Sequence, residues 1–246
     1  MGNMPEAVIA ALIISLGAAF GSFANLVIAR LPRGESIVTP RSYCENCKTP
    51  LKIPDLVPIL SFLFLRGRCR YCSARLSVAE PIIEFLTALL AALAWAKWSL
   101  TPEFFIDTLL VVVLLIISMI DLKEGVIFDV TLWAAGILAV AWLPLQEVPI
   151  QYLLGGGIAA GTFWFIRMLG TWIWKREAMG WGDVKLALVL GLFVGMEKLH
   201  YLILGAFVLA LIVSLPLLLT GRKKLADEIP FGPFLCAAAI IVLMLY

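Results

Sequence analysis

Charge is scarce in this sequence. Only 15% of the 246 residues are Asp, Glu, Lys or Arg, and the formal net charge is +2. A balance this small argues against a nucleic-acid partner, which would require a strongly basic face. The sole histidine, His200, has no neighbouring ligand set, so we expect an interfacial side chain rather than a metal ligand. No strand pattern precedes a Gly-rich turn of the ordinary nucleotide-binding kind.

Apolar residues make up 62% of the chain, and the mean hydropathy is +1.01. This composition predicts an all-α, polytopic membrane protein. A membrane-spanning helix needs about 17 to 25 mostly apolar residues, and we count eight candidate segments. They run from about Glu6 to Ala29, Glu80 to Lys97, Glu103 to Asp121, Ile127 to Leu145, Gln151 to Trp174, Asp183 to Val194, Leu199 to Thr220 and Pro230 to Tyr246. The sixth segment is too short to span comfortably.

The distribution of basic residues predicts the orientation. The first segment lacks the basic start of a signal peptide and exceeds a usual signal core in length, so we interpret it as an anchor. With eight alternating spans, 15 of the 19 Lys and Arg residues fall on one side, which the positive-inside rule makes cytoplasmic. Both termini are then outside. We expect a first transmembrane helix at 1–29, a cytoplasmic zinc-binding loop at 30–78 and a helical membrane core at 79–246.

The long loop contains two C-x-x-C pairs, Cys44 with Cys47 and Cys69 with Cys72, separated by 21 residues. Zinc prefers tetrahedral thiolate coordination, and two such knuckles predict one closed, structural zinc site. A pair of redox disulfides is the rival interpretation. The apolar side chains between the pairs are expected to pack beneath the knuckles or to lie on the membrane surface; they are Leu56, Ile59, Leu60, Phe62 and Leu63. Cys236 is expected to be a small, buried apolar side chain.

Two aspartates stand at the ends of apolar segments. Asp121 ends the helix pattern that includes Leu109 to Ile120, and Asp183 follows Gly180-Trp-Gly182. Two carboxylates in a partly desolvated site cannot both ionise easily, so one can act as a base while the other holds a proton. Such a pair is suited to aspartyl-protease chemistry. From the spacing alone, each aspartate could instead be an interfacial cap or a snorkelling residue.

Other charged residues leave alternatives open. Glu80 and Glu84 lie one helical turn apart, where the helix dipole explains them and a methyl-transfer role is the alternative. Lys185 either orients Asp183 or snorkels to the interface. Asp107 lies about 20 Å along the same helix from Asp121 at 1.5 Å per residue, too far to join its site. Arg167 is expected to find its partner on another helix.

Longer motifs resemble the bacterial type IV prepilin peptidases, which are intramembrane aspartyl proteases with a G-x-G-D signature. The signature matches residues 180–183, and further motifs match across nearly the whole chain. They are Gly21-Ser-Phe-Ala-Asn-Leu-Val-Ile-Ala-Arg-Leu-Pro32, Leu65-Arg-Gly-Arg-Cys-Arg-Tyr-Cys72, Glu80-Pro-Ile-Ile-Glu84, Ile120-Asp-Leu-Lys123 and Ile229-Pro-Phe-Gly-Pro-Phe234. The resemblance implies that Asp121 and Asp183 are the catalytic pair. It also implies that the zinc ligands are Cys44, Cys47, Cys69 and Cys72.

The family implies a multi-pass protein of the bacterial inner membrane whose active site faces the cytoplasm. The expected reaction removes the leader peptide from type IV prepilins and pseudopilins. Family members with the four-cysteine loop also methylate the new amino terminus with S-adenosylmethionine, but the residues that bind this donor are not identified by the sequence. A non-catalytic zinc-ribbon scaffold for pilus or type II secretion assembly is the alternative. A transporter is a second alternative, and the position of both aspartates at the cytoplasmic edge argues against it.

Overall fold

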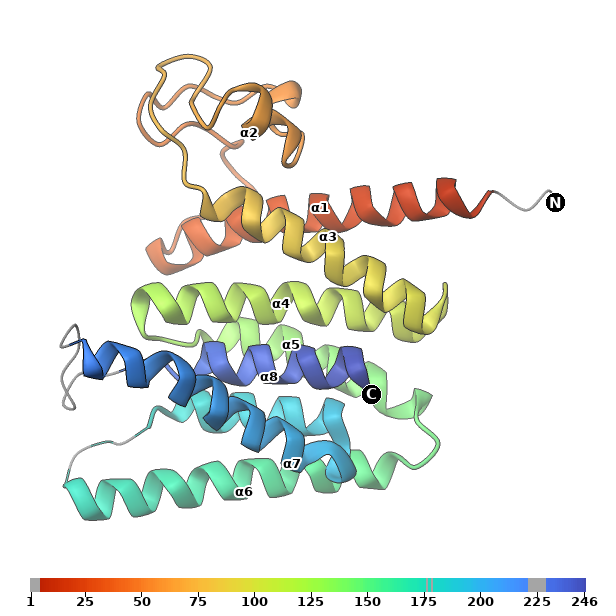
Figure 1. Ribbon diagram of the computed structural model, residues 1–246, viewed down its shortest axis with the longest axis vertical. Helices are drawn as coiled ribbons and strands as arrows, with labels where there is room; N and C mark the ends of the chain where they lie inside the picture. The colour runs from red at the N-terminus through yellow and green to blue at the C-terminus, as the bar shows by residue number, and fades with distance from the viewer. Residues whose placement is uncertain (1–4, 176, 178, 221–228) are drawn as a thin grey trace. The chain divides into compact units, whose positions relative to one another are not determined.

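The computed structural model describes residues 5–175, 177, 179–220 and 229–246 (Figure 1). The chain divides into two compact units, Met1–Val112 and Val113–Tyr246. The α-helices are α1 (Glu6–Arg30), α2 (Leu60–Phe64), α3 (Ala79–Trp98), α4 (Pro102–Glu124), α5 (Asp129–Trp142), α6 (Pro149–Trp174), α7 (Trp181–Leu219) and α8 (Gly232–Leu245). The short 3-10 helices are Leu31–Arg33, Ile53–Asp55 and Leu143–Leu145. About 75% of the chain is helical, and the described residues contain no strand, so the all-α prediction is confirmed.

Five helices in the described part of the chain are long and apolar enough to cross a membrane, namely α1, α3, α4, α6 and α7. The molecule is therefore a multi-pass membrane protein. Each of the eight predicted segments lies in a helix, with the sixth and seventh both in α7. Because α5 and α8 are shorter apolar helices, the number of eight spans stays a prediction. Among the basic residues used to predict the orientation, Arg176 and the cluster at 222–224 lie outside the described residues.

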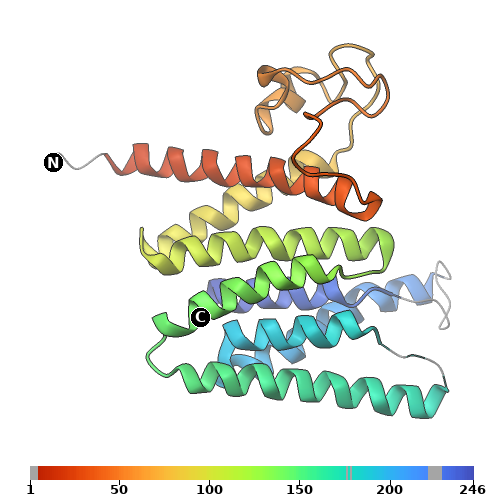
Figure 2. The same ribbon diagram turned by 180° about the vertical axis from the view of Figure 1, so that it is seen from behind.

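A break at Gly195 divides α7. Gly195 has φ 75° and ψ 169°, a backbone conformation that is essentially restricted to glycine. The two helical stretches are residues 181–194 and 196–219, and the chain turns back between them (Figures 1 and 2). This position agrees with the predicted boundary between the sixth and seventh segments.

Small residues let α1 and α3 pack closely in the first unit. A Cβ atom at Gly17 would lie 2.9 Å from the Cβ of Ala91, so any larger residue would force the helices apart. Ala24 of α1 and Ala94 of α3 are also fully buried. Membrane helices commonly associate through such small residues because the backbones can then approach closely.

Glycines play the same role between α6 and α7 in the second unit. A Cβ at Gly155 would lie 2.6 Å from the carbonyl oxygen of Gly191, and a Cβ at Gly191 would lie 2.5 Å from the carbonyl oxygen of Gly155. A Cβ at Gly156 would lie 2.8 Å from Leu192 Cγ. The expectation that the Gly155-Gly-Gly157 run serves packing is thus confirmed for its first two residues. A Cβ at Gly157 would meet no atom within 4 Å.

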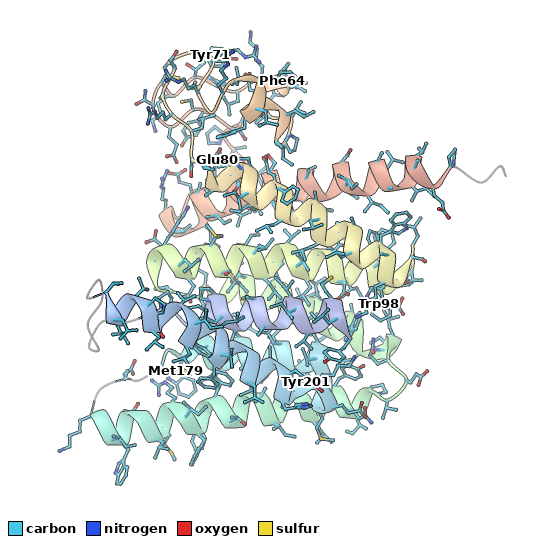
Figure 3. All side chains as sticks on the ribbon, in the orientation of Figure 1. Phe64, Tyr71, Glu80, Trp98, Met179 and Tyr201 are labelled. Atoms are coloured by element: carbon cyan, nitrogen blue, oxygen red, sulfur yellow. The ribbon has the colours of Figure 1, made fainter. Side chains whose placement is uncertain are left out.

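Residues 31–78, here called the four-cysteine lobe, connect α1 to α3 with turns, two 3-10 helices and the single-turn helix α2. Figure 3 labels Phe64 and Tyr71 in this lobe. The apolar residues between the two C-x-x-C pairs do not all have the same environment. Phe62 packs under the second knuckle, where a Cβ at Gly67 would lie 2.9 Å from its ring. Leu60 and Leu63 are exposed instead.

Candidate active site and metal centre

Asp121 lies in the last turn of α4. Leu114, Ile117 and Ile120 are at most 1% exposed, which shows that this end of the helix is embedded in protein. Asp121 follows directly and is only 4% exposed. The helix then ends at Gly125, whose φ of 66° closes the turn and whose N–H bonds to the Asp121 carbonyl at 2.9 Å. A carboxylate is therefore placed in a largely apolar environment.

Asp183 lies in the first turn of α7. Gly180 precedes the helix with extended backbone (ψ 153°) and serves as its N-cap residue. A negative charge in the first turn is favoured by the helix dipole. The Asp183 Oδ1 atom is buried and has no hydrogen-bond partner within the part of the chain that the structure describes. A buried carboxylate oxygen without a partner is costly and needs an explanation, and a catalytic role is one of them.

Gly232, Ile127 and Gly182 bring the two aspartates into one neighbourhood. The Gly232 N–H donates to Asp121 Oδ2 at 3.1 Å, and this contact is buried. A Cβ at Gly232 would lie 3.2 Å from Ile127 Cδ1, while a Cβ at Gly182 would lie 2.9 Å from Ile127 Cβ. Ile127 thus touches the residue that binds Asp121 and the residue that precedes Asp183. The two carboxyl groups are close enough to interact electrostatically.

Cys236 completes this neighbourhood from α8. Its side chain is 1% exposed, as expected from the sequence. It also lies within electrostatic range of both Asp121 and Asp183. The sequence offered no signal for this proximity, because Cys236 is separated by more than 50 residues from either aspartate. α4, α7 and α8 therefore all contribute to the site.

The pair can perform acid–base chemistry without a covalent intermediate. Two nearby carboxylates in a poorly solvated site share one proton more readily than they both ionise. The ionised member can take a proton from water, while the protonated member can donate to a carbonyl oxygen. Gly232 holds one of the four carboxyl oxygens in place, and Asp183 Oδ1 is left for a group that arrives from outside.

Lys185 has an acidic partner on α5 that neither expectation named. Its Nζ atom lies 2.6 Å from Asp129 Oδ1 at the start of α5, so the ammonium is paired with Asp129 rather than with Asp183, and snorkelling to the interface stays a prediction. Both side chains are more than half exposed, which makes this pair a weak contribution to stability. Sequence reasoning missed Asp129 because the partner is 56 residues away.

Arg167 finds partners both in the segment that leads into α7 and in the first residue of α7 itself. Its guanidinium pairs with Glu177 at 2.8 Å and donates from Nε to the Met179 carbonyl at 3.0 Å. It also lies 4.6 Å from the ring centroid of Trp181. Met179 is labelled in Figure 3. Arg167 therefore anchors the chain directly before Gly182 and Asp183, a positioning role that the sequence did not indicate.

Two other polar residues, Asp107 and His200, contact aromatic side chains. Asp107 is 1% exposed near the start of α4, and its Oδ2 accepts the indole N–H of Trp98 at 2.6 Å. His200 is exposed and stacks near Tyr201, with ring centroids 3.9 Å apart. Within the described residues, the candidate metal cluster consists of cysteines, so His200 takes no part in it.

The two C-x-x-C turns have the same backbone design. The Cys44 N–H donates to the Thr49 carbonyl at 3.0 Å, and the Cys69 N–H donates to the Ala74 carbonyl at 2.8 Å. In both turns the acceptor lies five residues after the donor. Isolated bridges close the turns between Tyr43 and Pro50 and between Arg68 and Arg75. Positive φ values occur at matching positions, 57° at Lys48 and 58° at Ser73. The sequence therefore folds into two equivalent knuckles.

The knuckles bring their four sulfurs together. All Sγ atoms of Cys44, Cys47, Cys69 and Cys72 lie within 4.8 Å of one another, and Cys44 Sγ lies 3.9 Å from Cys72 Sγ. A tetrahedral site with zinc–sulfur bonds of about 2.3 Å requires sulfurs roughly 3.8 Å apart. All five cysteines of the chain are described and are free in this structure. The donor set fits a zinc ion.

The surroundings favour thiolates at three of the four positions. The Thr49 hydroxyl lowers the pKa of Cys47, the Tyr71 N–H lowers the pKa of Cys69, and the Asn46 amide lowers the pKa of Cys72. At Cys44 the Cys47 N–H also lowers the pKa, but burial and the neighbouring sulfurs outweigh it and raise the value to about 11. Four adjacent thiolates repel one another without a cation between them, so a divalent metal would neutralise this cluster.

Two family models together cover the aspartate pair and the four-cysteine cluster. The model of the "Bacterial Peptidase A24 N-terminal domain" matches residues 15–98, and that of the "Type IV leader peptidase family" matches residues 108–215. A "Prepilin leader peptidase/N-methyltransferase" of Aeromonas salmonicida is 30% identical, with 91% of this chain and 86% of the relative covered. The chain belongs to the type IV leader peptidase family. The first model includes all four cluster cysteines, and the second includes both aspartates.

Other type IV leader peptidases show the same extent of similarity. The "Type 4 prepilin-like proteins leader peptide-processing enzyme" of Escherichia coli O78:H11 is 34% identical, with 93% of this chain and 91% of the relative covered. A "Prepilin leader peptidase/N-methyltransferase" of Bacillus subtilis is 30% identical, with 92% and 90% covered. No solved structure matches the chain. Family membership identifies the protein as an enzyme of the peptidase class.

Proposed function

We propose that this protein is an aspartyl endopeptidase of the bacterial inner membrane that removes the leader from type IV prepilins and pseudopilins at the cytoplasmic face. The observation that carries the proposal is the meeting of Asp121 and Asp183 around Ile127, with one carboxylate held by Gly232 and the other presenting an unpaired buried oxygen. The names of its relatives support the prepilin substrate.

In the proposed mechanism, the aspartates act as a pair on one water molecule. The ionised carboxylate removes a proton from the water, and the water oxygen attacks the scissile carbonyl. The protonated carboxyl group donates to the carbonyl oxygen and stabilises the negative charge that develops there. The amine leaves with a proton from the pair, so the site returns to a singly protonated state. Gly232 contributes by keeping the Asp121 carboxylate in a fixed orientation.

We also infer that the enzyme methylates the new amino terminus, because relatives carry both activities in their names. S-adenosylmethionine would supply the methyl group: the sulfur–carbon bond breaks, a nitrogen–carbon bond forms, and the amine loses a proton. In this proposal zinc has a structural role. It binds Cys44, Cys47, Cys69 and Cys72 and stabilises the four-cysteine lobe.

The deciding experiment is cleavage of a purified prepilin by the protein in detergent, with S-adenosylmethionine present and product masses recorded. We expect the unaltered enzyme to release the leader, and we expect Asp121→Asn and Asp183→Asn each to lose cleavage by at least about a thousandfold, because acid–base catalysis depends on both groups. A mature chain heavier by one methyl group supports the second activity. Normal cleavage by either variant would show that the aspartyl pair is wrong.

A further inference from the structure

The first unit contains a cavity of about 700 Å³ whose wall includes Cys44 and Cys69 of the four-cysteine cluster and whose other lining residues lie outside the sites above. It lies between the four-cysteine lobe, the C-terminal part of α1 and the N-terminal part of α3. Glu80, labelled in Figure 3, marks this end of α3. The volume is within the range of about 300 to 1,000 Å³ that is typical of small-molecule sites. The structure therefore offers room for a ligand of cofactor size.

Glu84 is the feature of this cavity that a packing role does not explain. Its residue is only 8% exposed, yet it lines the cavity. Glu80 lies in the first turn of α3, where the helix dipole is sufficient explanation, but Glu84 lies one turn further along. Its Oε2 accepts the Ile59 N–H at 2.7 Å, and Ser22 also hydrogen-bonds the carboxyl group. These contacts fix the carboxylate in one position.

Glu84 has no ion-pair partner among the residues that the structure describes. Burial of a carboxylate without a cation is costly, particularly at a membrane helix. Around the cavity, Arg33 is paired with Glu45 at 2.8 Å and Arg70 with Asp55 at 2.6 Å, and the buried Arg30 donates to the carbonyls of Ser36 and Arg41. A cation that enters the cavity would thus find Glu84 as its natural counter-ion.

The remaining lining suits a zwitterionic nucleoside better than a basic peptide. A basic peptide would need a uniformly acidic cavity, whereas here the lining includes four arginines, Arg30, Arg33, Arg70 and Arg75, as well as carboxylates. Leu26, Phe62 and Leu65 provide apolar surface for a flat base, and Asn25 and Ser22 provide polar groups. S-adenosylmethionine combines these needs, since it has a sulfonium cation, an amino-acid group and an adenine ring. The residues present fit this group.

We propose that this cavity binds S-adenosylmethionine and that the Glu84 carboxylate recognises the positively charged sulfonium end of the donor. The inference rests on the methyl-transfer part of the proposed function and gives it a location. It assigns donor binding to the first unit alone, in residues that do not include either catalytic aspartate. The sequence left a methyl-transfer role open for Glu80 and Glu84 together, and the proposal assigns donor recognition to Glu84.

The test compares two ligands by isothermal titration calorimetry on the purified full-length protein without prepilin. S-adenosylmethionine is cationic at sulfur, whereas S-adenosylhomocysteine is neutral there. We expect Glu84→Gln to lower the affinity for S-adenosylmethionine by about tenfold or more, because the charge interaction is removed. The affinity for S-adenosylhomocysteine should fall by less than about threefold. Glutamine keeps an oxygen that can accept the Ile59 N–H, so a merely structural defect would weaken both ligands equally.

Glu6→Gln is the matched control. Glu6 is exposed in the first turn of α1 and does not line the cavity, so its substitution should not change the preference between the two ligands. Zinc content and the unfolding midpoint report whether each variant has folded. If Glu84→Gln leaves the affinity for S-adenosylmethionine unchanged, the proposed site is wrong while methyl transfer can still stand. If Glu84→Gln weakens prepilin binding but leaves the affinities for both small ligands unchanged, the cavity binds the prepilin peptide instead of the methyl donor.

If the proposed function is wrong, the measurements differ from those expected when only the donor site is wrong. If the unaltered protein cleaves prepilin but binds neither ligand and adds no methyl mass, methyl transfer itself is absent and the donor site falls with it. If S-adenosylmethionine binds and depends on Glu84 while Asp121→Asn still cleaves, the aspartyl mechanism is wrong and the donor site is supported.

Discussion

Glycine 232 sets the position of the Asp121 carboxylate through a single N–H group. A Cβ atom there would lie 2.6 Å from Asp121 Oδ2, which is closer than carbon and oxygen can approach. The methyl group of alanine would therefore displace the carboxylate and loosen the hydrogen bond that holds it. Because the neighbouring Ile127 is also within 3.2 Å of that position, the displacement has little room to be absorbed elsewhere.

We expect Gly232→Ala to reduce prepilin cleavage by about a hundredfold, since a displacement of about 1 Å at reacting groups has this effect. The reduction is measured by comparing initial rates of leader release in detergent for the unaltered enzyme and the variant. Gly136→Ala is the control, because a Cβ at Gly136 meets no atom within 4 Å. Its helical position should make alanine neutral or stabilising by roughly 0.5–1 kcal/mol. Equal rates for Gly232→Ala and Gly136→Ala would contradict the positioning role.

At the scale of elements, α6 and α7 depend on direct backbone contact. Gly155 and Gly157 lie in the same helix two residues apart, but only Gly155 faces Gly191 at a distance that excludes a side chain. We expect Gly155→Ala to destabilise the protein by about 1 to 3 kcal/mol through overpacking. Gly157→Ala should leave stability unchanged or slightly increased. Unfolding midpoints in one detergent compare the two, and equal midpoints would show that this contact is unimportant.

A second prediction at this scale concerns the four-cysteine lobe. It is built from turns and short helices with few buried apolar residues, so a metal at the four sulfurs should determine its order. We expect one zinc ion per chain, measured by elemental analysis, and rapid proteolysis of residues 31–78 after chelation. Cys47→Ser should lose the zinc, whereas Cys236→Ser should retain it because Cys236 lies outside the cluster. Full zinc content in Cys47→Ser would refute the site.

For the whole molecule, the predicted orientation can be tested in intact cells with a membrane-impermeant maleimide. Eight alternating spans with both termini outside predict that Glu147→Cys, between α5 and α6, is labelled from outside. Gly34→Cys and Lys175→Cys should react only after permeabilisation. The unaltered protein measures the background from the native cysteines. Labelling of Gly34→Cys in intact cells would reverse the orientation and place the four-cysteine lobe outside.

The amino-acid sequence by itself determined the features that depend on local pattern. Hydropathy located the helical segments, C-x-x-C spacing indicated a shared metal site, and the motifs around Asp121 and Asp183 marked them as candidates. Such signals can be read because helix formation, membrane insertion and knuckle turns depend on neighbouring residues.

Only the tertiary structure decided which distant residues meet. The contact of Gly232 with Asp121 joins residues 111 positions apart, and the pairing of Lys185 with Asp129 joins residues 56 positions apart. The cavity at Glu84 likewise depends on how the four-cysteine lobe packs against α1 and α3. These partners are chosen by close approach of backbones and by burial of charge, which arise from the packing of whole elements rather than from any local pattern.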